Sequence, residues 1–99
     1  QALLKALATA LIMHGKIKTT KAKAKTLKQF AVKLVTRARK GDVQARRLLA
    51  RQIGVAAVKK LTDEIAPKFR ERAGGYTRVI PLPRRRSDGS EMAVVEFVS

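Results

Sequence analysis

Residues 21–39, KAKAKTLKQFAVKLVTRAR, decide the fold, because apolar side chains recur along them at spacings of three and four. This spacing predicts one long amphipathic helix whose apolar face packs into a core. We expect Thr20 to cap the start of this helix and Gly41 to end it. The predicted apolar face consists of Leu27, Phe30, Ala31, Leu34, Val35 and Ala38.

Three further helices are expected around this segment. Residues 2–13 carry an apolar stripe, and Gly15 is a candidate left-handed cap for a helix there. Asp42 is a suitable cap for a helix over residues 43–52. A fourth helix is predicted over residues 55–65. The apolar stripe of the first helix is Leu3, Leu4, Leu7, Leu11 and Ile12; the fourth helix should turn Val55, Val58, Leu61 and Ile65 inward and close at Pro67.

Strand patterns occupy the remaining segments. Residues 16–20 are rich in β-branched side chains, and residues 76–83 and 92–98 change to a period of two. Residues 84–91 should form a basic loop between the last two strands. The predicted fold is therefore a single α+β domain over residues 1–99, with about four helices and a small, three-stranded sheet.

The charge of the chain restricts its possible functions more than its predicted fold does. The chain has 23 Lys and Arg against 7 Asp and Glu, which gives a net charge of +16. The first acidic residue is Asp42, so the many earlier cations cannot mainly form internal salt bridges. A polyanionic partner would relieve their repulsion, with nucleic acid expected and an anionic membrane surface as the alternative. A solubilising surface normally mixes both signs of charge, which makes that simpler interpretation weaker here.

The residue inventory argues against an enzyme. His14 is the only histidine, there is no cysteine, and Asp63 and Glu64 are the only close pair of carboxylates. Neighbouring positions on a helix point about 100° apart, so this pair is poorly placed for joint acid–base chemistry. We therefore predict no catalytic residues, no metal, no cofactor and no small-molecule substrate.

Three segments are predicted to bind RNA phosphates. The first combines alternating lysines on a strand with the start of a helix, where backbone donors and the helix dipole favour an anion. The second surrounds a glycine pair, where Tyr76 serves either to stack on a base or to fill the core. The third is a run of three arginines without acidic neighbours. The three sets are Lys16, Lys18, Thr19, Thr20, Lys21, Lys23, Lys25 and Lys28; Arg70, Arg72, Gly74, Gly75, Tyr76 and Arg78; and Arg84, Arg85 and Arg86.

A DNA-binding protein of the nucleoid or helix-turn-helix type is the alternative. Ala50, Gly54 and Val58 faintly match the spacing of a helix-turn-helix. The second helix of that pair lacks a row of Arg, Asn or Gln for base edges, and the basic residues concentrate elsewhere.

Four blocks together resemble the family of bacterial large-ribosomal-subunit protein number seventeen: LIMHGKIKTTKAKAK (11–25), DEIAPKF (63–69), RAGGYTR (72–78) and MAVVEFV (92–98). The resemblance covers essentially the whole chain. It implies a structural protein near the exit of the peptide tunnel that binds large-subunit rRNA and neighbouring ribosomal proteins, in a cytoplasmic or organellar ribosome and not at a membrane. The family begins with an additional Arg-rich arm, so we expect a basic arm to be missing before residue 1.

Overall fold

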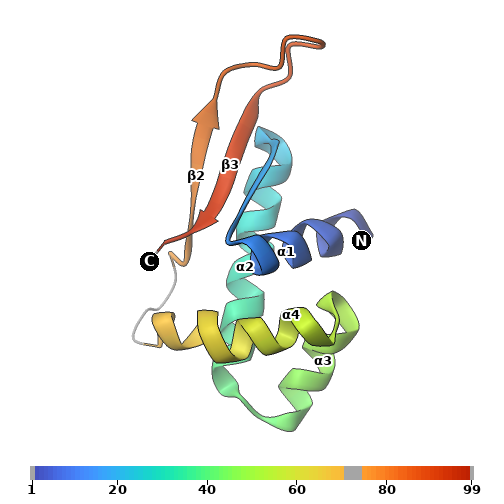
Figure 1. Ribbon diagram of the computed structural model, residues 1–99, viewed down its shortest axis with the longest axis vertical. Helices are drawn as coiled ribbons and strands as arrows, with labels where there is room; N and C mark the ends of the chain where they lie inside the picture. Colours follow the sequence, from blue (N-terminus) through green and yellow to red (C-terminus); the bar gives the residue numbers. More distant parts are fainter. Residues whose placement is uncertain (1, 71–74, 99) are drawn as a thin grey trace.

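The computed structural model describes residues 2–70 and 75–98 and has the predicted α+β fold (Figure 1). Helices and strands occur in the order that the sequence patterns indicate. Their bounds are α1 (Ala2–His14), β1 (Lys16–Thr20), α2 (Lys21–Lys40), α3 (Val43–Ile53), α4 (Val55–Lys60), the π-helix η1 (Leu61–Ile65), the 3₁₀-helix η2 (Ala66–Phe69), β2 (Thr77–Leu82) and β3 (Met92–Phe97).

The long helix α2 connects two halves of an elongated molecule that measures 45 × 27 × 18 Å. Figure 1 shows the sheet and the β2–β3 loop at one end, and α3 and α4 at the other, with α2 running past both. α1 crosses between the halves and contacts β1, α2, α3 and α4. The two halves therefore share one scaffold.

The sheet is antiparallel, with the strand order β1-β3-β2. β3 lies in the centre, so that Val95 is opposite Ile17 on one side and Val79 on the other. α2 packs on one face of this sheet. Since side chains alternate between the faces of a strand, β1 turns Thr19 toward the core and exposes Lys16 and Lys18 on the face opposite α2.

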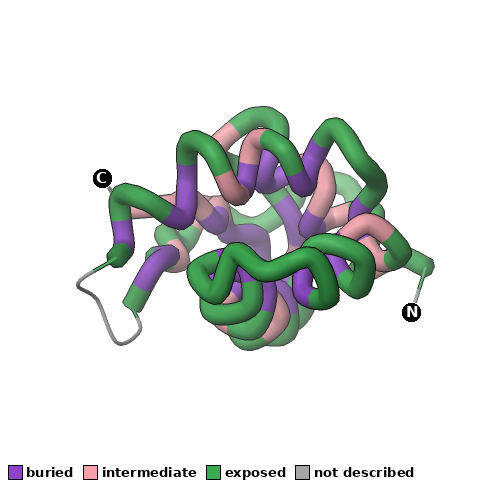
Figure 2. Tube along the Cα trace, turned by 90° about the horizontal axis from the view of Figure 1, so that it is seen from below, coloured by how far each residue is buried: buried purple, intermediate pink, exposed green. Residues whose placement is uncertain are grey.

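The core forms between α2 and the elements that surround it. Figure 2 shows the buried positions turned toward the interior and the exposed positions on the outer surface. Leu34 and Leu61 are buried, and the rings of Phe69 and Tyr76 pack against each other with centroids 5.2 Å apart. Tyr76 thus joins the end of the helical half to the start of β2.

The predicted caps are confirmed. Thr20 accepts a hydrogen bond from the backbone N–H of Lys23, and Asp42 accepts one from Ala45 at 2.7 Å. Gly41 ends α2 at φ +67°, in the left-handed conformation that glycine adopts without strain. These local contacts explain why the helix bounds could be predicted closely.

Three predictions about the helices are wrong. Val55 is 78% exposed, because α4 begins at the corner after Gly54, beyond the edge of the core. Leu3, in the first turns of α1, is 51% exposed. Pro67 does not end the last helical segment. After α4 the chain continues through the wider turns of the π-helix η1 and then as the 3₁₀-helix η2, which ends at Phe69. Pro67 lies in the first turn of η2, where its missing N–H leaves no hydrogen bond unmade.

Candidate nucleic-acid interface

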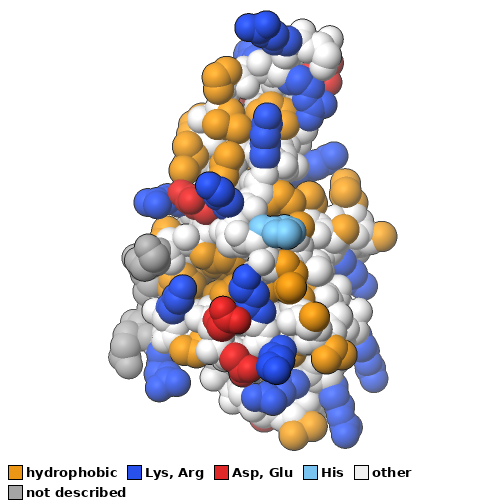
Figure 3. Space-filling model, viewed as in Figure 1, with side chains coloured by type: hydrophobic (Ala, Val, Ile, Leu, Met, Phe, Trp, Pro, Cys, Tyr) orange, Lys and Arg blue, Asp and Glu red, His pale blue; other side chains and the backbone are white. Residues whose placement is uncertain are grey.

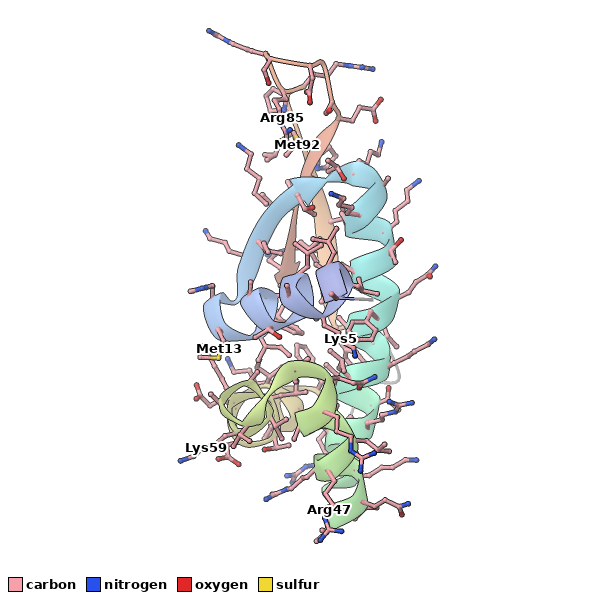
Figure 4. All side chains as sticks on the ribbon, turned by 90° about the vertical axis from the view of Figure 1, so that its right-hand side faces the viewer. Lys5, Met13, Arg47, Lys59, Arg85 and Met92 are labelled. Carbon is pink, nitrogen blue, oxygen red and sulfur yellow. The ribbon has the colours of Figure 1, made fainter. Side chains whose placement is uncertain are left out.

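The predicted lysines at the start of α2 do not form one surface. Lys21, Lys25 and Lys28 follow spacings of four and three and lie on one side of the helix; we call them the helix-face lysines. Lys23 lies on another side, where it borders a hollow lined by Leu4 and Leu7 of α1. All four lysines are exposed. Figure 4 shows nitrogen-tipped side chains projecting into solvent along the length of α2.

The electrostatics at the start of α2 favour an external anion. The first turn contains no acidic residue, although the positive end of the helix dipole lies there. One carboxylate comes near: Glu91 pairs with Lys21 at 3.7 Å, and both side chains are about half exposed. Within residues 2–70 and 75–98, Lys25 and Lys28 form no ion pair. Their charge is thus available to a partner.

A second group of cations lies on the open face of the sheet. Lys16 and Arg78 are both aligned with Glu96 of the central strand, so the sheet brings two separately predicted segments together. Arg78 donates to Glu96 at 2.8 Å, which neutralises part of this group. Lys16, Lys18 and Arg78 are the sheet-face cations, and they lie on the side of the sheet away from α2.

The predicted threonines have mainly structural roles. The side chain of Thr19 is turned into the core and only 8% exposed. Thr20 uses its hydroxyl as the cap of α2, and the backbone N–H of Lys21 donates to the carbonyl of Glu91. The start of α2 therefore offers fewer unpaired donors to a phosphate than the sequence indicated.

Tyr76 fills the core, which was one of its two expected roles. It is 1% exposed, and its hydroxyl accepts a hydrogen bond from Nη1 of Arg39 at 2.7 Å. No ring face is left for an RNA base. Gly75 is exposed at φ +64°, with open space around it, and Arg70 is exposed. Arg72 and Gly74 lie outside the described residues.

The arginine loop, residues 83–91, corrects the expectation of arginines without acidic neighbours. Arg84 pairs with Glu91 at 3.1 Å, and Arg85 pairs with Asp88 at 3.4 Å. The pKa of Asp88 lies below its ordinary value, because the backbone and side chain of Ser90 hydrogen-bond to its carboxylate, with Arg85 adding attraction. Among Arg84, Arg85 and Arg86, Arg86 is the one with no ion pair to a described residue.

Sequence reasoning missed a group of cations at the other end of α2. Arg39, Lys40 and Arg46 belong to none of the three predicted RNA-binding segments. In the folded chain they border one cleft with Arg70. Arg39, Lys40 and Arg46 lie within eight positions of one another, but Arg70 comes 24 positions after Arg46, so the sequence does not display the four as one group. Figure 3 shows Lys and Arg side chains reaching this end of the molecule as well as the loop end.

The described residues contain neither a helix that is long and apolar enough to cross a membrane nor a group of three or more His, Cys, Asp or Glu side chains placed to hold a metal ion. The surface features that stand out in this part of the chain are thus its groups of cations.

Comparisons with known proteins identify the family of the chain. A sequence model of the family described as ribosomal protein L17 matches residues 3–98. The large ribosomal subunit protein bL17 of Campylobacter lari is 52% identical over 99 residues, which cover 99% of this chain and 85% of the relative. The same-named protein of Thermus thermophilus is 52% identical over 93 residues, covering 92% and 79%. That of Clostridium acetobutylicum is 46% identical over 99 residues, covering 99% and 87%. This chain therefore belongs to the ribosomal protein L17 family.

Proposed function

We propose that this chain is a structural component of the large ribosomal subunit that binds large-subunit rRNA through phosphate contacts, near the exit of the peptide tunnel. Its relatives are large-subunit proteins, which supports a place for this chain in the ribosome beside rRNA and other ribosomal proteins. The family supports a scaffolding role and not an enzymatic one.

The observation that carries the proposal is the uncompensated charge of the helix-face lysines. Lys21 lies in the first turn of α2, at the positive end of the helix, and the exposed Lys25 and Lys28 follow on the same side. Among the described residues, one carboxylate, that of Glu91, pairs with one of these three lysines. Like charges in this position destabilise the folded chain unless an anion binds. RNA phosphates supply that anion and release counterions when they are neutralised.

Nothing in the fold favours the DNA-binding alternative. The segment after Gly54 exposes Val55, Lys59 and Asp63, which does not provide the row of hydrogen-bonding side chains that reads base edges. α4 itself ends after six residues and continues as a π-helix. A recognition helix of the usual kind is therefore absent from the described residues.

The test replaces Lys21, Lys25 and Lys28 by Ser and measures affinity for large-subunit rRNA over a range of salt concentrations. The slope of log affinity against log salt should become shallower by about 2–3, because each lost phosphate contact contributes roughly 0.7–0.9. Circular dichroism should remain unchanged, since all three side chains are exposed.

A triple Ser variant of Lys5, Lys33 and Lys59 is the matched control, with the same change in charge on exposed positions of other surfaces. Figure 4 shows Lys5 on α1 and Lys59 below it, on α4. The control should change the slope much less. Equal effects of the two variants, or tighter binding of duplex DNA than of rRNA at the same salt, would contradict the proposal.

A further inference from the structure

A basic cleft lies where the end of α2 meets the start of α3 and the segment η1–η2. Its volume is about 600 Å³, within the range of roughly 300–1,000 Å³ that ligand sites occupy. Thr36 and Thr62 contribute hydroxyls to its wall. Four cations from three segments border it: Arg39 and Lys40 at the end of α2, Arg46 in α3, and Arg70 after η2.

No carboxylate belongs to the described lining of this cleft. Two described acids come close to the cleft along the chain. Asp42 caps α3 through the N–H of Ala45, and Asp63 lines a second hollow between α3 and α4, which Arg46 and Thr62 also border. Glu71, which follows Arg70, lies outside the described residues. Among the described residues, Lys40, Arg46 and Arg70 form no ion pair. A concentration of cations in a concave surface focuses the electric field and attracts an anion.

Arg39 gives the cleft a fixed wall. Its Nη1 donates to the hydroxyl of buried Tyr76 at 2.7 Å, and its Nη2 donates to the carbonyl of Arg70 at 2.8 Å. These bonds hold Arg39 in place and position the backbone of Arg70 beside the end of α2. The other three side chains are exposed and can turn toward a ligand. Arginine pairs bidentately with phosphate, which suits a site of this composition.

We propose that this cleft binds the phosphate backbone of a second RNA segment, so that the protein bridges two segments of RNA. The inference rests on the proposed function, in which the helix-face lysines contact the first segment. Lys25, in the middle of the helix-face lysines, and Lys40, at the cleft, are 15 residues apart on α2, which separates the two sites by about 22 Å along the helix. Four of the ten residues that border the cleft are exposed cations, and they come from three segments of the chain, a spread that suits an extended RNA backbone better than a single small anion.

The test is a triple Ser variant of Lys40, Arg46 and Arg70, with Arg39 left intact because it bonds to the core. Hydroxyl-radical footprinting on large-subunit rRNA should show one set of protected nucleotides lost. A different set should be lost with the Ser variant of the helix-face lysines. The salt slope should fall by about 2–3 in each case. The matched control, Lys33, Arg47 and Arg51 replaced by Ser, removes the same charge outside the cleft and should keep both sets.

Three outcomes would overturn the inference. If the cleft variant keeps every protection while the helix-face variant loses some, the cleft does not bind RNA and the proposed function stands. If both variants lose the same nucleotides, there is one RNA segment and no bridge. If inorganic phosphate shifts the NMR signals of the cleft while its variant leaves the footprint intact, the cleft binds a small anion instead. Should rRNA fail to bind the unaltered protein, the proposed function itself would fall.

Discussion

The helix-face lysines and the arginine loop carry three cations each, yet they offer different amounts of charge to a partner. One of the three lysines has an ion pair, whereas two of the three arginines, Arg84 and Arg85, have one. Glu91, the last residue of the arginine loop, pairs with both Lys21 and Arg84. A run of basic residues in the sequence therefore overstates the free charge wherever the fold brings acids alongside.

The two regions also differ in rigidity. The lysines extend from a capped helix whose opposite side is buried in the core, with Leu27 and Leu34 fully enclosed. The loop is exposed from residue 83 to residue 89, and its ion pairs lie in solvent, where water and salt screen their attraction. A phosphate can displace such pairs, but it then competes with an internal carboxylate.

The largest expected effect is the difference in the salt dependence of rRNA binding between two variants, one with Ser at the three helix-face lysines and one with Ser at the three loop arginines. A variant with Ser at Arg84, Arg85 and Arg86 should reduce the salt slope of rRNA binding by about 1, against about 2–3 for the helix-face variant. Arg86 alone lacks an ion pair, which is why the loop should lose fewer contacts. Filter binding at four or more salt concentrations measures both slopes. A loop variant as damaging as the helix-face variant would show that its internal pairs do not limit RNA binding.

Replacing Glu91 by Gln should make the loop more like the helix face. The change removes the carboxylate that Lys21 and Arg84 share, so both cations become available to phosphates. Affinity for rRNA at fixed salt should rise several-fold, and the slope should steepen by up to about 2. The free energy of unfolding should change by less than about 1 kcal/mol, because the pairs are exposed. An Asp63→Gln variant removes the same charge elsewhere, and an equal rise in affinity there would mean that net charge alone is responsible.

The smallest expected effect is that of acidification on the structure of the arginine loop. The pKa of Asp88 is lowered in the folded chain, so its contribution to loop order is present above the ordinary pKa and is lost as pH falls through the lowered one. As the pH falls through this lowered pKa, the amide of Ser90 should lose its hydrogen bond to Asp88. NMR shifts of that amide report the change. An Asp88→Ala variant should show no such titration, and persistence of the titration there would assign it to another group.

Most of the fold could be predicted from short-range patterns. Thr20, Gly41 and Asp42 set helix bounds through contacts within three or four residues, which the sequence displays directly. Val55 and Pro67 were misjudged because burial at a corner and a change from α- to π- and 3₁₀-helix depend on how the last helix packs under α2. Of the candidate site, the exposure of the early lysines could be predicted; their division between two sides of the molecule could not.

The sequence by itself determined the composition of this protein's surface: a large excess of positive charge, a long amphipathic helix with lysines at its start, and the blocks that mark its family. Only the tertiary structure decided which charges are available. It placed Glu91 beside Lys21, enclosed Tyr76 under Arg39, and gathered Arg39, Lys40, Arg46 and Arg70 around one cleft. The physical reason is that a helix cap acts over a few residues, whereas an ion pair or a cleft acts across space and depends on which distant segments the core holds together.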